Sequence, residues 1–467
     1  MNKIEKYKEL ISRLEKKEYS FDQEIIKPHC LDWRKSYRGT SELIIFPKNT
    51  KKLAEVVKFC FKKNISIVPQ GGNTGLVGGS VPRKNKSEII INLKNLNKIR
   101  KFNPLSYSII VESGCILESI QSFVLKNNLV FPISMGSRGT CQIGGNIATN
   151  AGGINVIKYG LLRENIIGLE AILSDGTILS ELMDIKKNNT GYDLKQLLIG
   201  SEGTLAIITA ANIKLYPKPK DKKILFANFT DIKRLLEFYN SIIRVFSDSV
   251  TAFEMIDKNS MEIVLKNNSQ LKRVLTKNSY YCLVELSNFI NIENFNDFIL
   301  KNLDKINTSF NDLIVTKSET ENQKLWEYRE LIPLAENKEG FCIKHDVSIP
   351  LDNMAKFIKE TSLEIKRVNK NFDIINFGHI GDNNLHFNVF NKKEPQSNYL
   401  SKNKKIINNI IFKNAKLYDG SFSAEHGIGQ LKKKELRKFK NKNSIDKMLR
   451  IKEIFDPKKI LNPGKVF

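Results

Sequence analysis

The chain has 467 residues, too many for one ordinary hydrophobic core, so two or three domains are expected. Hydrophobic residues make up 41% of it and no apolar run approaches the ~20 residues of a membrane-spanning helix, which excludes a disordered chain and a transmembrane protein. The formal net charge of +25 comes from lysines spread over the whole length. The densest basic runs carry one aromatic residue, Phe439, and lack the stacking platforms of a single-strand binder, so solvated surface is favoured over nucleic-acid binding.

The N-terminal stretch MNKIEKYKELISRLEKKEYS predicts a short amphipathic helix, because its charges have helical spacing and it has no apolar signal core. Its glutamates count against a mitochondrial transit peptide. The six cysteines are scattered without a C-x-x-C pair, which indicates reduced thiols. We therefore expect a cytoplasmic protein and leave open a peripheral association with the inner membrane.

The next part of the chain alternates strands and helices. ELIIFP (42–47) and ISIVPQGG (65–72) resemble strands, and the stretch between them contains a helix with an apolar stripe, TKKLAEVVKFCFKKN (50–64). Residues 160–217 again contain strand-like runs and end at Pro217 and Pro219. This pattern predicts an N-terminal domain of residues 1–219.

Glycine is concentrated in two windows, GGNTGLVGG (71–79) and GSRGTCQIGGNIATNAGG (136–153). Clustered glycines indicate positive φ angles or a close approach of the backbone to a ligand, and runs of exposed N–H groups suit phosphates. Neither window is a Walker loop or a dinucleotide G-x-G-x-x-G fingerprint. Two such loops could hold a pyrophosphate between them, and tight turns at sheet corners are the structural alternative.

From residue 220 amphipathic helices (IKRLLEFYNSIIRVF) alternate with strands (YYCLVELSNF), and a helical pattern begins again near 406. We predict a second domain at 220–405 and a C-terminal segment at 406–467.

Two of the five histidines lie in NFGHIGDNNLHFN (376–388). Read as two strands joined by a loop at 381–384, this stretch pairs His379 with His386 across the ladder, on one face of the sheet. Two imidazoles so placed can share a metal ion, and two surface histidines in a hairpin are the alternative. SAEHGIG (423–429) offers Glu425 and His426, of which one can bind the metal while the other does separate chemistry.

Three long motifs carry a family resemblance: PQGGNTGLVGGSVP (69–82), GSRGTCQIGGNIATNAGG (136–153) and NNTGYDLKQLLIGSEGTLAIIT (188–209). They resemble the FAD-binding domain of the vanillyl-alcohol-oxidase-like flavoproteins, and within them the D-2-hydroxyacid dehydrogenases, the D-2-hydroxyglutarate dehydrogenases in particular. The resemblance implies an α+β fold: a PCMH-type FAD-binding domain of two α+β subdomains, an α+β cap domain for the substrate, and a C-terminal helical segment.

The resemblance also implies the site residues. FAD is expected to be non-covalent, because Asn73 stands where some relatives carry a tethering histidine. The residues expected to bind FAD are Gly71, Gly72, Asn73, Thr74, Gly75, Gly79, Ser80, Gly136, Gly144, Gly145, Asn146, Thr149, Asn150, Gly152, Gly153, Tyr159, Gly160, Glu202, Gly203, Ile207 and Asn462.

For the chemistry, the resemblance implies that His379, His386 and Glu425 hold zinc or another divalent metal and that His426 is the general base. Arg329 in WEYREL and Lys344 in CIKHDVSIP are expected to bind the substrate, together with Asn388 on the face that carries His386. We assign no role to His29 and expect a structural or cap-lining role for His345.

The expected reaction is oxidation of a D-2-hydroxy acid to the 2-oxo acid, with hydride transfer to flavin N5. Pro333 stands where the hydroxyglutarate enzymes carry a threonine, which leaves D-2-hydroxyglutarate, D-lactate and D-malate open. The alternative is the FAD subunit of a glycolate-oxidase-type complex with an iron–sulfur partner. An electron-transfer flavoprotein or a quinone is the expected electron acceptor, and a homodimer is left open.

Overall fold

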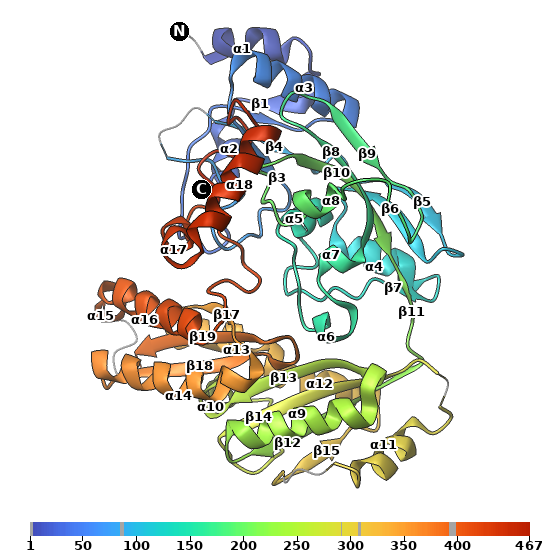
Figure 1. Cartoon of the computed structure of the whole chain (residues 1–467), viewed down its shortest axis with the longest axis vertical. Helices are drawn as coiled ribbons and strands as arrows, with labels where there is room; N and C mark the ends of the chain where they lie inside the picture. The colour runs from blue at the N-terminus through green and yellow to red at the C-terminus, as the bar shows by residue number, and fades with distance from the viewer. Residues whose placement is uncertain (1–2, 85–87, 291, 307–309, 392–397) are drawn as a thin grey trace. The chain divides into compact units, whose positions relative to one another are not determined.

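The computed structural model describes residues 3–84, 88–290, 292–306, 310–391 and 398–467. The chain folds into two compact units, each built of helices and sheets (Figure 1). Unit 1 comprises residues 1–152, 160–217 and 425–467, and unit 2 comprises residues 153–159 and 218–424. The short segment 153–159 thus belongs to unit 2, although it lies inside the predicted N-terminal domain of residues 1–219. Boundaries predicted along the chain, at 219 and 405, could not show this, because segments that pack together can be far apart in sequence.

The first sheet of unit 1 has the order β1-β2-β4-β3, in which β2, β4 and β3 are parallel. Helix α3 (Thr50–Lys63) joins β2 to β3, as its apolar stripe predicts. Asn49 caps this helix by accepting a hydrogen bond from the Lys52 N–H, and Asn64 ends it in the left-handed conformation. The strands are β1 (Tyr19–Ser20), β2 (Ile44–Ile45), β3 (Ile67–Gln70) and β4 (Ile89–Asn92).

The second sheet of unit 1 is antiparallel and has the order β5-β6-β10-β8-β9. Helices α4 and α5 share a hydrophobic core with β6, β8 and β10, separate from the core around α3. These two cores correspond to the two expected subdomains. The elements are β5 (Ile99–Asn103), β6 (Ser108–Glu112), α4 (Leu117–Leu125), α5 (Ile143–Ala148), β8 (Ile166–Ile172), β9 (Ile178–Glu181) and β10 (Ile207–Lys214).

Shorter elements complete unit 1, and no helix among the described residues is both long and apolar enough to cross a membrane. These elements are α1 (Lys3–Ile11), η1 (Lys16–Glu18), α2 (Gln23–His29), β7 (Leu129–Val130), α7 (Leu162–Asn165), α8 (Lys195–Leu198), β11 (Tyr216–Pro217), α17 (Lys433–Phe439) and α18 (Lys442–Phe455).

Unit 2 is built on one antiparallel sheet with the order β15-β12-β14-β13-β18-β19-β16, and β17 also pairs with β19. The long central strands are almost entirely buried, because helices cover both faces (Figure 1). The strands are β12 (Asp221–Phe229), β13 (Val250–Asp257), β14 (Tyr280–Asn288), β15 (Leu313–Val315), β16 (Cys342–Ile343), β17 (Asp346–Ser348), β18 (Phe372–His379) and β19 (Asn384–Asn391).

The two faces of this sheet carry different helices. Side chains from α10, α12 and α13 share a core with Ile256, Ile375 and Phe377. On the other face, Phe253 packs against Tyr239 of α9, and Phe387 packs against Phe357 of α14. The helices are α6 (Val156–Tyr159), α9 (Ile232–Phe246), η2 (Ser247–Ser249), α10 (Lys258–Asn267), α11 (Phe295–Leu303), α12 (Glu319–Glu330), α13 (Ile332–Lys338), α14 (Leu351–Val368), η3 (Ile380–Asp382), α15 (Tyr399–Lys402) and α16 (Lys404–Leu417).

The two glycine windows meet in unit 1. A Cβ atom on Gly72 would lie 2.2 Å from the carbonyl oxygen of Thr140, and one on Gly71 would touch the Gln142 side chain. Glycine at position 72 is therefore required by the close approach of two loops. By contrast, no atom lies within 4 Å of a Cβ on Gly75.

We predict that Gly72→Ala destabilises unit 1 by about 1–3 kcal/mol, because the new methyl group must push the 140 loop away. Gly75→Ala is the matched control and should stay within about 0.5 kcal/mol of the parent. Thermal melting of the two variants checks this, and equal melting temperatures would contradict it.

Candidate active site

The histidine hairpin forms as predicted, with a different register. β18 and β19 pair His386 with Phe377, and His379 lies opposite Glu254 of β13. The expected direct pairing of His379 with His386 is wrong, because η3 and the left-handed Asn383 place the turn at 380–383, one residue earlier than the expected loop at 381–384. The shift is two residues, so both histidines remain on one face of the sheet.

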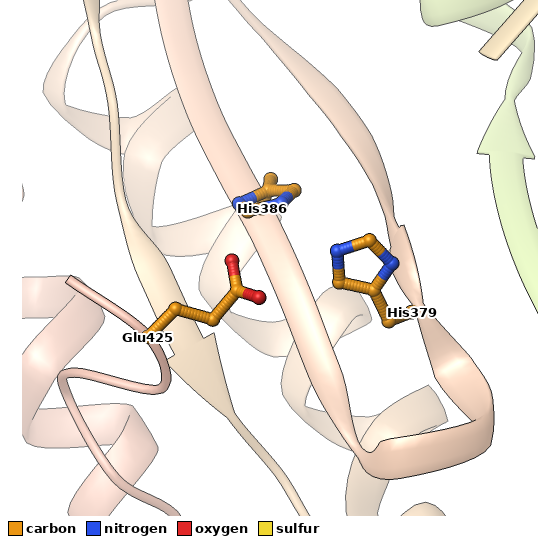
Figure 2. A group of neighbouring side chains, drawn as sticks. All are labelled: His379, His386 and Glu425. Carbon is orange, nitrogen blue, oxygen red and sulfur yellow. The ribbon is translucent and has the colours of Figure 1, made fainter. Parts of the chain in front are cut away.

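The two imidazoles and a carboxylate come together on that face (Figure 2). One ligand atom each of His379, His386 and Glu425 lies within 4.8 Å of the others, and the carboxylate of Glu425 points towards both rings. Glu425 follows Ala424, whose N–H donates to the carbonyl oxygen of Asp346 in β17, 3.3 Å away. The structure thus brings the three predicted metal ligands together.

Glu254 is a functional candidate that sequence reasoning missed. Its side chain is fully buried, and its two oxygens accept hydrogen bonds from His379 Nδ1 and Arg329 Nε, each at 2.6 Å. Burial by itself raises the pKa of Glu254, but the charges of His379 and Arg329 outweigh it and the pKa is lowered. When the imidazole is neutral, the carboxylate favours the tautomer with the proton on Nδ1, which leaves Nε2 as the candidate ligand atom.

The signal for Glu254 was present in the sequence as a charged residue inside the apolar strand VTAFEMID. A carboxylate in a strand buried on both faces requires partners, and these partners are distant in sequence. The same holds for the fully buried Asp346, which accepts a 2.7 Å hydrogen bond from Asn384 Nδ2. Asp346 also lies close enough to Glu425 and His426 for the three to form a second possible ligand group.

The predicted substrate residues line the same face of the sheet. Arg329 is buried, and its guanidinium stacks over the ring of Phe377 at 4.6 Å. Asn388 donates to Glu336 Oε1 at 2.6 Å, and Lys344 Nζ lies 2.9 Å from Glu336 Oε2. His345, the remaining histidine of this unit, bonds the Phe387 carbonyl and Asn408, which is the expected structural role.

In unit 1 the glycine windows are joined by polar side chains. Asn73 donates to the Leu31 carbonyl and accepts from the Ser80 hydroxyl, so it is held in its left-handed conformation. Gln70 bonds the backbone of Ser80 and contacts His29, a histidine outside every motif. The first glycine loop is therefore anchored by the side chains of Asn73 and Gln70.

Glu202, expected to bind the cofactor, has its carboxylate on the turn that follows His426. It accepts hydrogen bonds from the N–H groups of Ile428 and Gly429, both at 2.7 Å. Burial raises the pKa of Glu202 although these N–H groups oppose the shift. Asn462 links the carbonyls of Gly79 and Glu202, so the first glycine loop, the Glu202 loop and the C-terminal segment converge.

The other predicted cofactor residues are distributed unevenly. Gly153 and Tyr159 belong to the segment grouped with unit 2. Ile207 has a buried side chain in the core around α3. The residues that remain in unit 1 are Thr74, Gly136, Gly144, Gly145, Asn146, Thr149, Asn150, Gly152, Gly160 and Gly203.

Comparison with known proteins shows which family the chain belongs to. Residues 218–466 match the model described as the C-terminal domain of FAD linked oxidases, and residues 41–180 match an FAD binding domain. The chain belongs to the FAD-linked oxidase family.

The relatives and the structures agree with this family. "D-2-hydroxyglutarate dehydrogenase, mitochondrial" of Arabidopsis thaliana is 35% identical, over 95% of this chain and 78% of the relative. The protein of the same name from Bos taurus is 34% identical, over 95% of this chain and 80% of the relative. The structure of p-cresol methylhydroxylase superposes with a TM-score of 0.75 at 15% identity, covering 98% of this chain and 95% of that chain. The predicted α+β, PCMH-type fold is confirmed, and the chain is a flavin-dependent oxidoreductase.

The prediction of a cytoplasmic protein is wrong by the same comparison. Both relatives are named as mitochondrial proteins. Acidic residues near the start of the sequence and unpaired cysteines were weak grounds, because neither property reports where a folded enzyme resides.

The residues of unit 1 fit the FAD of this family. Gly75, Gly136 and Gly145 have open space where a Cβ would stand, so their backbone is accessible to a ligand. Among the described residues, the buried oxygens Asn146 Oδ1 and Gln142 Oε1 have no hydrogen-bond partner. Gln142, which sequence reasoning missed, is thus a further candidate for contact with the cofactor.

The donor set of His379, His386 and Glu425 fits a divalent ion. Two imidazoles and one carboxylate are typical ligands of catalytic zinc, with positions left for substrate. The hydrogen bond from His379 Nδ1 to Glu254 is the outer contact that such histidines usually make.

We predict that Glu254→Gln weakens the binding of Zn²⁺ about 10–100-fold, because the neutral amide no longer orients and polarises His379. Titration of the metal-free protein with Zn²⁺ measures this. The matched control is Glu285→Gln, which removes a buried carboxylate from β14 that pairs with Lys222 and Thr251 instead. Equal affinities of the two variants would contradict the role of Glu254.

Proposed function

We propose that this oxidoreductase oxidises a D-2-hydroxy acid to the 2-oxo acid, using non-covalent FAD and one divalent metal ion. The observation that carries the proposal is the group of His379, His386 and Glu425, backed by Glu254, in a chain of the FAD-linked oxidase family. The relatives named D-2-hydroxyglutarate dehydrogenase support the reaction class.

The reaction removes a proton from the substrate hydroxyl and a hydride from C2, and the C2–O bond becomes a double bond. Bound FAD supplies the two-electron acceptor, and a bound divalent ion supplies Lewis-acid polarisation of the hydroxyl. His426 takes the hydroxyl proton as the general base, a role for which imidazole is suited. One ligand atom each of Asp346 and His426 lies within 4.8 Å of the other, so the Asp346 carboxylate can orient the base.

The remaining residues bind and orient the substrate. Nε of Arg329 is committed to Glu254, which leaves the two Nη groups to grip a carboxylate from one side. His379 and His386 orient the ion through rings whose centroids are 5.7 Å apart. The Glu202 carboxylate fixes the turn behind His426, so the base is held by a hydrogen-bonded backbone. An electron-transfer flavoprotein or a quinone is the proposed acceptor of the electrons.

We predict that D-2-hydroxy acids reduce the flavin of the purified protein and that their L-enantiomers do not. Removal of metal by a chelator should abolish this reduction, and addition of Zn²⁺ or Mn²⁺ should restore it. Loss of flavin absorbance under anaerobic conditions is the measurement, across a panel of acids. Full reduction after complete chelation would refute the metal role.

We also predict that His426→Gln lowers the rate constant for flavin reduction about 10²–10⁴-fold, because the proton acceptor is lost. FAD content and Zn²⁺ affinity should remain those of the parent. His386→Gln is the comparison variant and should lose the metal. If His426→Gln also loses the metal, His426 is a ligand and the assignment as base is wrong.

A further inference from the structure

A buried carboxylate stands among the candidate substrate residues. Glu336 lies in α13 and is 2% exposed. Its Oε1 accepts the 2.6 Å hydrogen bond from Asn388, and its Oε2 lies 2.9 Å from the ammonium of Lys344. Asn388 and Lys344, two of the three residues expected to bind the substrate, therefore both contact the carboxylate of Glu336.

Glu336 is close to the candidate metal ligands, of which His386 is the nearest in sequence to its partner Asn388. Asn388 follows His386 by two residues on β19, so the two side chains project from the same face about 7 Å apart. Phe377, the cross-strand partner of His386, carries the guanidinium of Arg329 on its ring. The face of the sheet next to the ligands is thus bordered by Arg329 and by the group of Lys344, Asn388 and Glu336.

The charges on this border cancel. The two cations are Arg329 and Lys344, and each forms an ion pair with a buried carboxylate, Glu254 and Glu336 respectively. The Nη groups of Arg329 are left for one carboxylate, so a second carboxylate on the substrate would have to displace the pair of Lys344 and Glu336 and would then face an uncompensated buried anion. Pro333, at the start of helix α13, which also carries Glu336, has no hydroxyl that could donate a hydrogen bond to such a second carboxylate.

Glu336 also has acceptor capacity left. Oε2 is buried and accepts no well-directed hydrogen bond from the described residues, although the Lys344 ammonium is near. A carboxylate in this state repels an anionic group and tolerates an uncharged one or a hydrogen-bond donor.

We infer that Glu336 determines specificity and makes this enzyme prefer monocarboxylic 2-hydroxy acids over dicarboxylic ones. The inference rests on the proposed function and narrows its substrate class. It differs from the expectation that the names of the relatives suggest, since 2-hydroxyglutarate is a dicarboxylic acid.

The test compares kcat/KM for D-lactate and D-2-hydroxybutyrate with kcat/KM for D-malate and D-2-hydroxyglutarate, using the full chain loaded with FAD and metal. The parent should favour the monocarboxylic acids at least tenfold. Glu336→Gln should narrow this ratio at least tenfold by raising the values for the dicarboxylic acids, because Lys344 and Asn388 become available to a second carboxylate.

Glu339→Gln is the matched control, since it removes the same charge just beyond the end of the same helix, where Glu339 pairs with Lys266 and Asn267. It should leave the ratio within twofold of the parent. Glu336→Asp keeps the negative charge and should retain the preference for monocarboxylic acids.

Two results would overturn the inference: a parent enzyme that favours dicarboxylic acids, or a ratio that Glu336→Gln leaves unchanged while FAD content and melting temperature match the parent. If Glu336→Gln does not fold, the parent enzyme's preference between monocarboxylic and dicarboxylic acids is the deciding test of the inference. A flavin that no 2-hydroxy acid reduces would instead refute the proposed function, which is a separate outcome.

Discussion

The hydrogen-bonded carboxylate of Glu254 is the constraint on which the arrangement of His379 and Arg329 in unit 2 depends. It is fully buried and bonded to a histidine of the metal group through one oxygen and to an arginine through the other. A buried charge of this kind is stable only when its partners stay in place, so the three side chains are fixed together. The sheet supplies the rigidity, since Glu254 and His379 lie opposite each other on neighbouring strands.

A second constraint acts in unit 1, where three loops of the chain meet at close range. The glycines of the first two windows allow backbone to touch backbone, and Glu202 and Asn462 bond the neighbouring turns. The turn after His426 is therefore fixed by the same polar contacts that organise the cofactor loops. Three residues in these contacts, Asn73, Glu202 and Asn462, are held at positive φ.

Charge compensation distinguishes the substrate side of the site. The basic chain carries a formal charge of +25, yet both cations predicted to bind the substrate, Arg329 and Lys344, are paired with buried carboxylates. Overall charge thus says little about the local field, which depends on which acids are buried beside which bases. In the proposed reaction, the number of uncompensated cations then limits how many carboxylates the substrate carries.

The sequence by itself determined the family, the α+β class and the histidine pair of the candidate metal site, because these depend on local motifs and on strand periodicity. His379 and His386 had to share a face once the stretch formed a hairpin, whatever its register. Only the tertiary structure decided that register, the joining of Glu425 to the hairpin, and the partners of Arg329 and Lys344. These depend on contacts between residues far apart in sequence, such as Glu254 with Arg329, whose pairing is set by how strands and helices pack.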